Sequence, residues 1–134
     1  MLKCLATKEF FMTTKPTANL QLIYVSDIDR STAFYKTLFK AEPVFSSPRY
    51  VAFASGGDTL FAIWTGGTTP DPSAPRFSEV GIMLPKNEDV DNLFEEWKEM
   101  TDIKILQEPR DEIFGRTFLV QDPDGHIIRV SPLD

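Results

Sequence analysis

The feature that most constrains the fold of this 134-residue chain is an order of elements that occurs twice. A short apolar strand is followed by an amphipathic helix and then by three further strands. We find this order over residues 19–65 and again over residues 76–134. Residues 66–75 hold three prolines, two glycines and no large apolar residue, which is typical of a linker. The sequence therefore predicts one compact α+β domain of two βαβββ units.

Capping residues and apolar spacing place the two helices. Ser26 or Asp27 can cap a helix near residues 29–40, and Asn87 is expected to cap the second helix. Each helix then carries apolar residues at helical spacing, which predicts a buried stripe. The stripes comprise Phe34, Tyr35, Leu38 and Phe39 in the first helix, and Val90, Leu93, Phe94, Trp97 and Met100 in the second.

The strands are bounded by proline, glycine and aspartate. The turn Asp122-Pro123-Asp124-Gly125 is the strongest of these signals, because proline presets φ and glycine accepts a positive φ. Its two carboxylates are therefore interpreted as turn residues and not as a catalytic pair. The remaining strands are expected near residues 42–46, 49–55 and 58–65 in the first unit and near 78–84, 103–107, 115–121 and 126–131 in the second.

Composition narrows the class of partner. The formal net charge is −6, which argues against nucleic acid or an anionic membrane as the main partner. Cys4 is the sole cysteine, so no intrachain disulfide can form and a cytoplasmic setting is expected. No apolar run is long enough to span a bilayer. Residues 1–18 are interpreted as an N-terminal extension, either a disordered arm or a start-site artefact with translation beginning at Met12.

The opening VSDIDRSTAFY and the closing FLVQDPDGHIIRV, together with the paired βαβββ units, resemble the glyoxalase/bleomycin resistance (vicinal oxygen chelate) superfamily. The resemblance covers residues 19–132. It implies two curved half-sheets with helices outside, a cavity inside and a homodimer that shares each cavity. The segments SPRYVAF, GDTLFAIWTGG, RFSEVGIMLP and HIIRVSPLD look like the phenazine-antibiotic resistance proteins of that superfamily, which hold a drug without known turnover.

The resemblance places the four metal-ligand positions of the superfamily at Leu20, Ala62, Glu79 and Arg129. Only Glu79 has a suitable donor, and Arg129 would repel a cation, whereas a catalytic metal needs about three protein ligands. The single histidine, His126, falls outside the pattern. We therefore expect no metal, no cofactor and no catalytic residue.

A ligand is expected to rest on flat side chains. Strand alternation places Leu60, Ala62 and Trp64 on one face, and the family alignment directs that face to the cavity. A small residue beside an indole would make a slot for a fused aromatic ring, and stacking adds roughly 0.5–1.5 kcal/mol beyond burial. The alternative is that Trp64 is a dimer-interface or edge residue.

Further candidates follow from the same period of two. Leu20, Leu22 and Tyr24 share the inner face of the first strand. Tyr50 and Phe53 cannot both point inward, and Tyr50 is favoured. Met83 and Gly81 have the parity of Glu79, and a thioether packs well beside a flat ring.

Two arginines complete the candidate set. Arg129 is expected to form a partly buried ion pair with Glu79 in place of the metal, so that removing either residue costs several kcal/mol. Alternatively, Arg129 binds a ligand carboxylate through its two-pronged guanidinium. Arg116 is either a ligand contact or a solvated surface charge.

Three functions are compatible with these observations. The first is antibiotic resistance by sequestering a planar aromatic drug in a metal-free cavity at a dimer interface. The second is a glyoxalase-like lyase or dioxygenase-type enzyme that modifies such a compound. The third is a dimeric module whose cavity is closed by its own side chains. Recovery of the ligand unchanged after long incubation would separate the first from the second.

Overall fold

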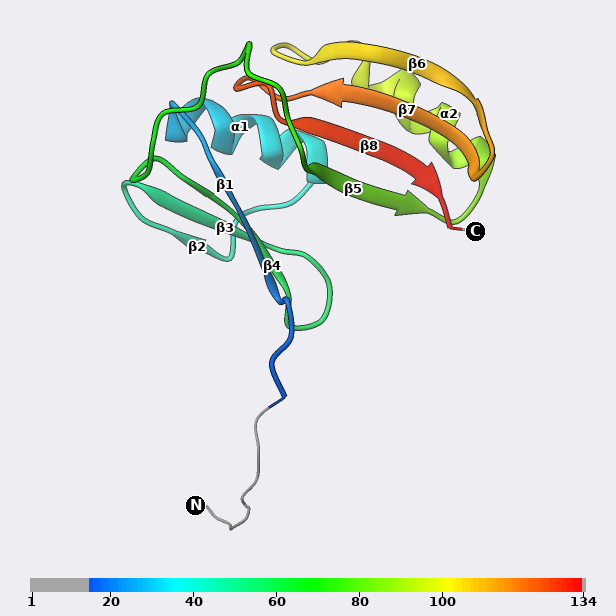
Figure 1. Cartoon of the computed structure of the whole chain (residues 1–134). Helices are drawn as coiled ribbons and strands as arrows, with labels where there is room; N and C mark the ends of the chain where they lie inside the picture. Colours follow the sequence, from blue (N-terminus) through cyan, green and yellow to red (C-terminus); the bar gives the residue numbers. More distant parts are fainter. Residues whose placement is uncertain (1–14, 134) are drawn as a thin grey trace.

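The protein, described over residues 15–133 by a computed structural model, follows the predicted order of elements twice (Figure 1). The predicted N-terminal extension lies largely outside the described residues. The first half contains β1 (Leu20–Tyr24), α1 (Ile28–Phe39), β2 (Phe45–Ser46), β3 (Tyr50–Ala54) and β4 (Leu60–Trp64). The second half contains β5 (Glu79–Leu84), α2 (Asn87–Trp97), β6 (Lys104–Glu112), β7 (Gly115–Gln121) and β8 (Ile127–Pro132). The predicted α+β fold of two βαβββ units is confirmed.

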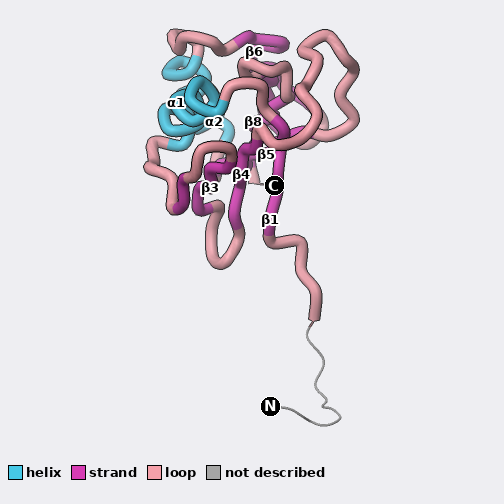
Figure 2. Tube along the Cα trace, turned by 90° about the vertical axis from the view of Figure 1, so that its left-hand side faces the viewer, coloured by secondary structure: helices cyan, strands magenta, loops and turns pink. Residues whose placement is uncertain are grey.

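Each half forms its own four-stranded sheet. The strand orders are β1-β4-β3-β2 and β5-β8-β7-β6, so the first strand of each half pairs in parallel with the last. The two sheets lie side by side in Figure 1, and both helices lie on the same side of them in Figure 2. Within residues 15–133, the opposite face of each sheet therefore carries no helix.

Both helices begin near the predicted positions, with one correction. The N-cap of α1 is Asp27, whose carboxylate accepts a hydrogen bond from the Arg30 backbone N–H at 3.0 Å. The N-cap of α2 is Lys86, so the prediction of Asn87 as the cap was wrong. Asn87 is instead the first helical residue, and its side-chain oxygen accepts from the Arg116 backbone N–H at 3.1 Å.

Two strands differ in length from the sequence pattern. β2 has only two residues, whereas the pattern predicted a strand near residues 42–46. β6 has nine residues and continues through Pro109, well beyond the predicted end at residue 107. It is the edge strand of its sheet, where proline is tolerated, and its register shifts twice against β7.

The closing turn joins the two halves. Asp122 and Asp124 are buried, at 4% and 1% exposure. The Tyr35 hydroxyl of α1 donates to Asp122 at 2.7 Å, and the Ser26 hydroxyl donates to Asp124 at 2.6 Å. Beyond the predicted turn, these two carboxylates thus anchor the second half of the chain to the first.

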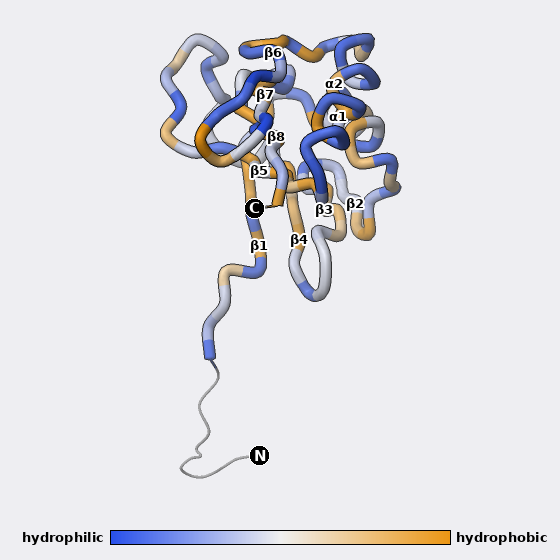
Figure 3. Tube along the Cα trace, turned by 90° about the vertical axis from the view of Figure 1, so that its right-hand side faces the viewer, coloured by the Kyte–Doolittle hydropathy of each residue, from blue (hydrophilic) through white to orange (hydrophobic). Residues whose placement is uncertain are grey.

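The apolar core is continuous between the halves and lies under the helices. It includes the α1 stripe and Phe61 of the first sheet, and the α2 stripe and Phe118 of the second sheet. Figure 3 shows that β1 and β4 are themselves largely apolar. Neither of the two helices in residues 15–133 is long and apolar enough to cross a membrane.

Candidate functional site

An aromatic row crosses the open face of the first sheet. The register pairs Tyr24 of β1 with Trp64 of β4, and Trp64 with Tyr50 of β3. Paired residues project to the same side of a sheet. The neighbouring β4 residues Phe61 and Ile63 are buried toward α1, so the row projects to the face without a helix. The structure therefore brings together the three aromatic residues predicted for the site, including Tyr50 in preference to the buried Phe53.

The rings of this row are held at defined angles. Tyr24 and Trp64 meet edge to face, with centroids 5.3 Å apart and planes at 79°. Tyr50 makes a similar contact with Phe45, at 5.9 Å and 66°. Tyr24 keeps 40% of its surface exposed and Phe45 keeps 56%. An accessible aromatic surface of this kind suits a flat apolar ligand.

Phe45 is a site residue that sequence reasoning missed. It pairs with Ala52 across the β2–β3 hairpin, and Ala52 pairs with Ala62, so Phe45 belongs to the open face. Its register depends on where the hairpin turns, which the sequence of residues 45–50 does not specify strongly. The aromatic contact with Tyr50 is visible only once that register is known.

The aliphatic part of the site lies beside the aromatic row. Leu20 and Leu22 of β1 remain 48% and 38% exposed on the open face. Ala62 lies on the same face, paired with Leu22, but is fully buried. The predicted open slot beside the indole is therefore closed in the single chain, and a ligand would contact the surrounding side chains first.

The open face of the second sheet carries the remaining candidates. Glu79, Gly81 and Met83 alternate along β5, and Gly81 pairs with Arg129 of β8. Met83 is 65% exposed. A Cβ placed on Gly81 would meet no atom within 4 Å, so this face is open above the strand. Glu79, Gly81 and Met83 therefore lie on one face, as predicted. This face combines one ion pair with the flexible thioether of Met83.

Glu79 and Arg129 form the predicted ion pair in a two-pronged geometry. The Nε and Nη2 atoms of Arg129 donate to Oε1 and Oε2 of Glu79 at 2.7 and 3.0 Å. The hydrogen bond from the guanidinium lowers the pKa of Glu79 and raises that of Arg129. Both side chains keep about a third of their surface exposed, at 33% and 35%. Removing either residue should therefore lower the free energy of unfolding of the single chain by about 1 kcal/mol. This is less than the several kcal/mol predicted for a buried pair.

The residues at the four positions that the resemblance assigns to a metal do not fit a metal ion. Leu20 and Ala62 offer no donor atom, and both oxygens of Glu79 are bound by Arg129. Within residues 15–133 no three His, Cys, Asp or Glu side chains are grouped so that they could hold a metal. His126 bonds through Nε2 to the Tyr24 carbonyl oxygen at 2.6 Å, away from these positions.

Arg116 is the one predicted site residue that lies apart from the others. Its side chain projects from β7 toward α2, where Nε donates to Asp91 at 2.9 Å. A second contact joins it to Asp111 at 3.4 Å. The parity of β7 explains this position, because Phe118, two residues later, is buried under the same helix. Arg116 therefore ties a helix to a strand and is not brought together with the open faces.

Phe114 is a second residue that sequence reasoning missed. It lies in the β6–β7 turn, and its ring centre is 5.8 Å from the guanidinium carbon of Arg129, within cation–π range. The turn sequence EIFG gives no parity, so no strand pattern could assign Phe114 to a face. In the structure it borders the ion pair and keeps 53% of its surface exposed.

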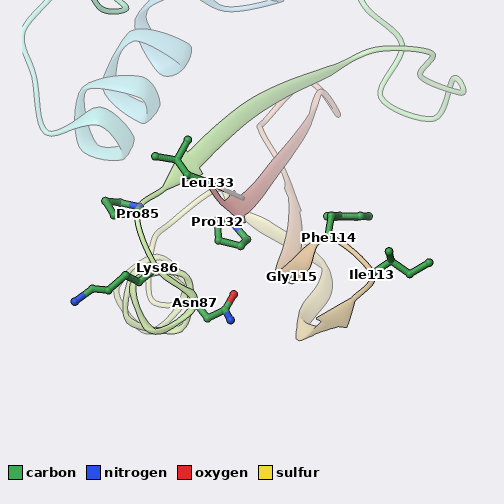
Figure 4. A pocket seen from close by; sticks show the side chains of 8 residues that line it. All are labelled: Pro85, Lys86, Asn87, Ile113, Phe114, Gly115, Pro132 and Leu133. Carbon is green, nitrogen blue, oxygen red and sulfur yellow. The ribbon is translucent and has the colours of Figure 1, made fainter.

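A pocket of about 730 Å³ lies beyond this turn, at the far end of the second sheet (Figure 4). None of the predicted site residues lines it. Its only charged lining residue, Lys86, is paired with Glu88 at 3.1 Å. The lining residues are Pro85, Lys86, Asn87, Ile113, Phe114, Gly115, Pro132 and Leu133. Phe114 thus borders both this pocket and the ion pair, whereas the predicted residues of the candidate site lie on the open sheet faces.

The comparison with known proteins agrees with the fold. Residues 17–130 match the Glyoxalase/Bleomycin resistance protein/Dioxygenase superfamily, and the chain belongs to this family. The chain is also 62% identical over 120 residues to the phenazine antibiotic resistance protein EhpR of Enterobacter agglomerans. That alignment covers 88% of this chain and 93% of the relative. The narrower resemblance predicted from the middle segments is thus confirmed.

Solved structures of the same fold are more distant in sequence. The solution structure of protein ATC0852 from Agrobacterium tumefaciens is 28% identical, with a TM-score of 0.74 over 91% of this chain and 99% of that one. The fosfomycin resistance protein FosX from Listeria monocytogenes, determined as a mutant with Mn(II), is 20% identical. Its TM-score is 0.70 over 89% of this chain and 90% of that one. The FosX comparison supports the fold alone.

Proposed function

We propose that this protein confers antibiotic resistance by binding and sequestering a planar aromatic drug of the phenazine type, without a metal or other cofactor and without turnover. The observation that carries the proposal is the aromatic row of Tyr24, Trp64 and Tyr50 on a sheet face that no helix covers. The 62% identity to a phenazine antibiotic resistance protein supports the choice of ligand class. A cytoplasmic location is part of the same proposal.

The two open faces also support a homodimer. Leu20, Leu22, Tyr24 and Met83 expose apolar surface that a soluble protein usually covers. Pairing two copies through these faces would enclose a cavity between them, with an aromatic wall on one side and the Glu79–Arg129 pair on another. Such a cavity combines flat apolar surfaces with few polar anchors, which is the common design of small-molecule sites.

Sequestration is favoured over catalysis by the chemistry of the open faces. Arg129 engages both carboxylate oxygens of Glu79, which leaves that carboxylate neither a free base nor a metal ligand. The buried carboxylates Asp122 and Asp124 are used by the closing turn. The side chains of the aromatic row supply contact area and not a nucleophile.

The proposal is tested by fluorescence titration with a phenazine carboxylic acid, using protein treated with EDTA. A Trp97→Phe variant leaves Trp64 as the only indole. Trp97→Phe removes no hydrogen bond, because the buried indole N–H of Trp97 has no partner among the described residues. The smaller ring leaves a cavity in the core, so the stability of this variant is measured first. We expect saturable quenching near one ligand per chain in Trp97→Phe. Trp64→Ala lacks the reporting indole, so its affinity is measured by calorimetry. It should bind at least about tenfold more weakly, since it loses both stacking and buried area.

Chromatography and mass spectrometry of the ligand after long incubation distinguish binding from turnover. Quantitative recovery of unchanged phenazine supports sequestration. A new product that forms in proportion to protein would favour the glyoxalase-like or dioxygenase-type alternative. Absence of saturable binding by any planar aromatic would refute the drug-binding proposal.

A further inference from the structure

Two consecutive glycines lie directly against the two rings at one end of the aromatic row. A Cβ placed on Gly66 would be 2.3 Å from Nε1 of Trp64 and 2.5 Å from its Cζ2. A Cβ placed on Gly67 would be 2.6 Å from Cε2 of Tyr24. Atoms of real side chains do not approach this closely, so each ring occupies the space of a missing side chain.

The backbone does not require glycine at these positions. Gly56, Gly57, Gly115 and Gly125 have a positive φ, which side-chain-bearing residues rarely adopt, but Gly66 and Gly67 do not. An alanine would therefore be acceptable to the backbone at residues 66 and 67. The contact with the two rings is the steric feature that opposes it.

The glycines act on rings that the core does not hold. Tyr24 is 40% exposed and Trp64 is partly exposed, so neither is fixed by burial on all sides. Their mutual edge-to-face contact at 5.3 Å restrains one side of each ring. The backbone of residues 66–67 restrains another, because the chain turns back over the rings directly after β4.

We infer that Gly66 and Gly67 are positioning residues that fix the orientation of Trp64 and Tyr24 and thereby select planar ligands. This inference rests on the proposed drug-binding function. A ring that is already oriented does not lose rotational freedom when the ligand stacks on it, and preorganisation of this kind increases affinity. A flat ligand gains most, because only a flat ligand can use the full face of a fixed ring.

The test compares Gly66→Ala and Gly67→Ala with Thr69→Ala, an exposed position in the same loop, all in the Trp97→Phe background. We expect each glycine variant to bind the phenazine carboxylic acid roughly two- to tenfold more weakly, the cost of ordering one side chain. A twisted diphenyl carboxylic acid of similar size should lose much less affinity. Equal losses for both ligands, or no loss for either, would overturn the inference.

Near-UV circular dichroism of Trp64 supplies a readout that needs no ligand. We expect Gly66→Ala to change this spectrum and Thr69→Ala to leave it unchanged. If the wild type binds no planar aromatic but the spectrum changes, the proposed function fails while ring positioning stands. An unchanged spectrum in Gly66→Ala refutes the positioning role, whatever the wild type binds.

A double-variant comparison keeps the test valid if an alanine destabilises the fold. Gly67→Ala is measured alone and combined with Tyr24→Ala, and Gly66→Ala alone and combined with Trp64→Ala. If each glycine acts through its ring, removing the ring abolishes the stability cost of the added methyl group. A cost that persists without the ring would show that the glycines serve the loop and not the site.

Discussion

At the residue scale, the Glu79–Arg129 pair occupies two of the positions that the resemblance assigns to a metal. Its two-pronged geometry at 2.7 and 3.0 Å favours a contribution to folding stability. The exposure of about a third of each side chain makes that contribution smaller. In a double-mutant cycle of Glu79→Gln and Arg129→Met, we expect a coupling energy of about 0.5–1 kcal/mol in urea unfolding. Zero coupling would show that the pair does not contribute to stability.

The same pair has a defined pH dependence. Its hydrogen bonds lower the pKa of Glu79 in the folded state, so its stabilisation is complete above the ordinary carboxyl value near 4.5. As the pH falls through the lower folded pKa, the carboxylate is protonated and that stabilisation is lost. Wild type should therefore lose more stability than Glu79→Gln between neutral pH and pH about 3.

Gly81 tests whether the ligand reaches the second sheet. A side chain at this position would enter open space above the strand, and the backbone φ is not positive. We expect Gly81→Leu to change the free energy of unfolding by less than about 0.5 kcal/mol, as is usual away from packed sites. The phenazine titration should nevertheless show a large loss of affinity. Unchanged affinity would confine the ligand to the first sheet.

Sequence reasoning at this scale succeeded where alternation in a strand decided the face. The period of two placed Trp64 and Tyr24 on the inner faces of their strands, and the register pairs these two residues. It left Tyr50 and Phe53 as alternatives, and the register pairs Tyr50 with Trp64. It failed for residues in turns or with long side chains. Phe114 lies in a hairpin turn that has no parity, and Arg116 finds its partner Asp91 on a helix distant in sequence.

At the scale of elements, the closing turn connects the two halves through buried hydrogen bonds. Asp124 accepts from both the hydroxyl and the backbone N–H of Ser26, at 2.6 and 3.0 Å. An asparagine has one acceptor oxygen and would place an amide against one of these donors. We expect Asp124→Asn to lower the free energy of unfolding by about 1–3 kcal/mol, measured with urea.

The control for this substitution is Asp58→Asn, an exposed carboxylate in the β3–β4 turn. It makes the same chemical change without a buried acceptor, so its effect should be small. Equal effects in both variants would assign the loss to a change of net charge and not to the turn.

Element order was predictable because hydrophobic periodicity and turn residues are local signals. The ends of the elements were less predictable, because they depend on contacts with segments distant in sequence. β6 continues through Pro109 since an edge strand leaves that position unpaired, a fact known only from the strand order. Asn87 has the residue type of a cap, yet its side chain bonds to the backbone of β7. The burial of Asp122 and Asp124 likewise required the packing of the two halves.

At the scale of the whole molecule, the open faces lead us to expect association of two copies. Leu22 lies on the first open face, on the side of the sheet away from α1. We expect Leu22→Lys to shift the protein toward a monomer in light scattering coupled to gel filtration, since a charge is costly in an apolar interface. Asn92→Lys, on an exposed position of α2, makes the same addition of charge and should leave the mass unchanged. A monomeric wild type would contradict the shared cavity.

The Glu79–Arg129 pair also has a consequence for how this fold could change its chemistry during evolution. Replacing Arg129 with a metal-binding residue would first leave Glu79 without its partner, while Leu20 and Ala62 would still lack donor atoms. No single substitution at these positions therefore creates a metal site, and the first step carries a cost in stability. The pair therefore opposes a stepwise gain of a metal ion at the positions that the resemblance assigns to one.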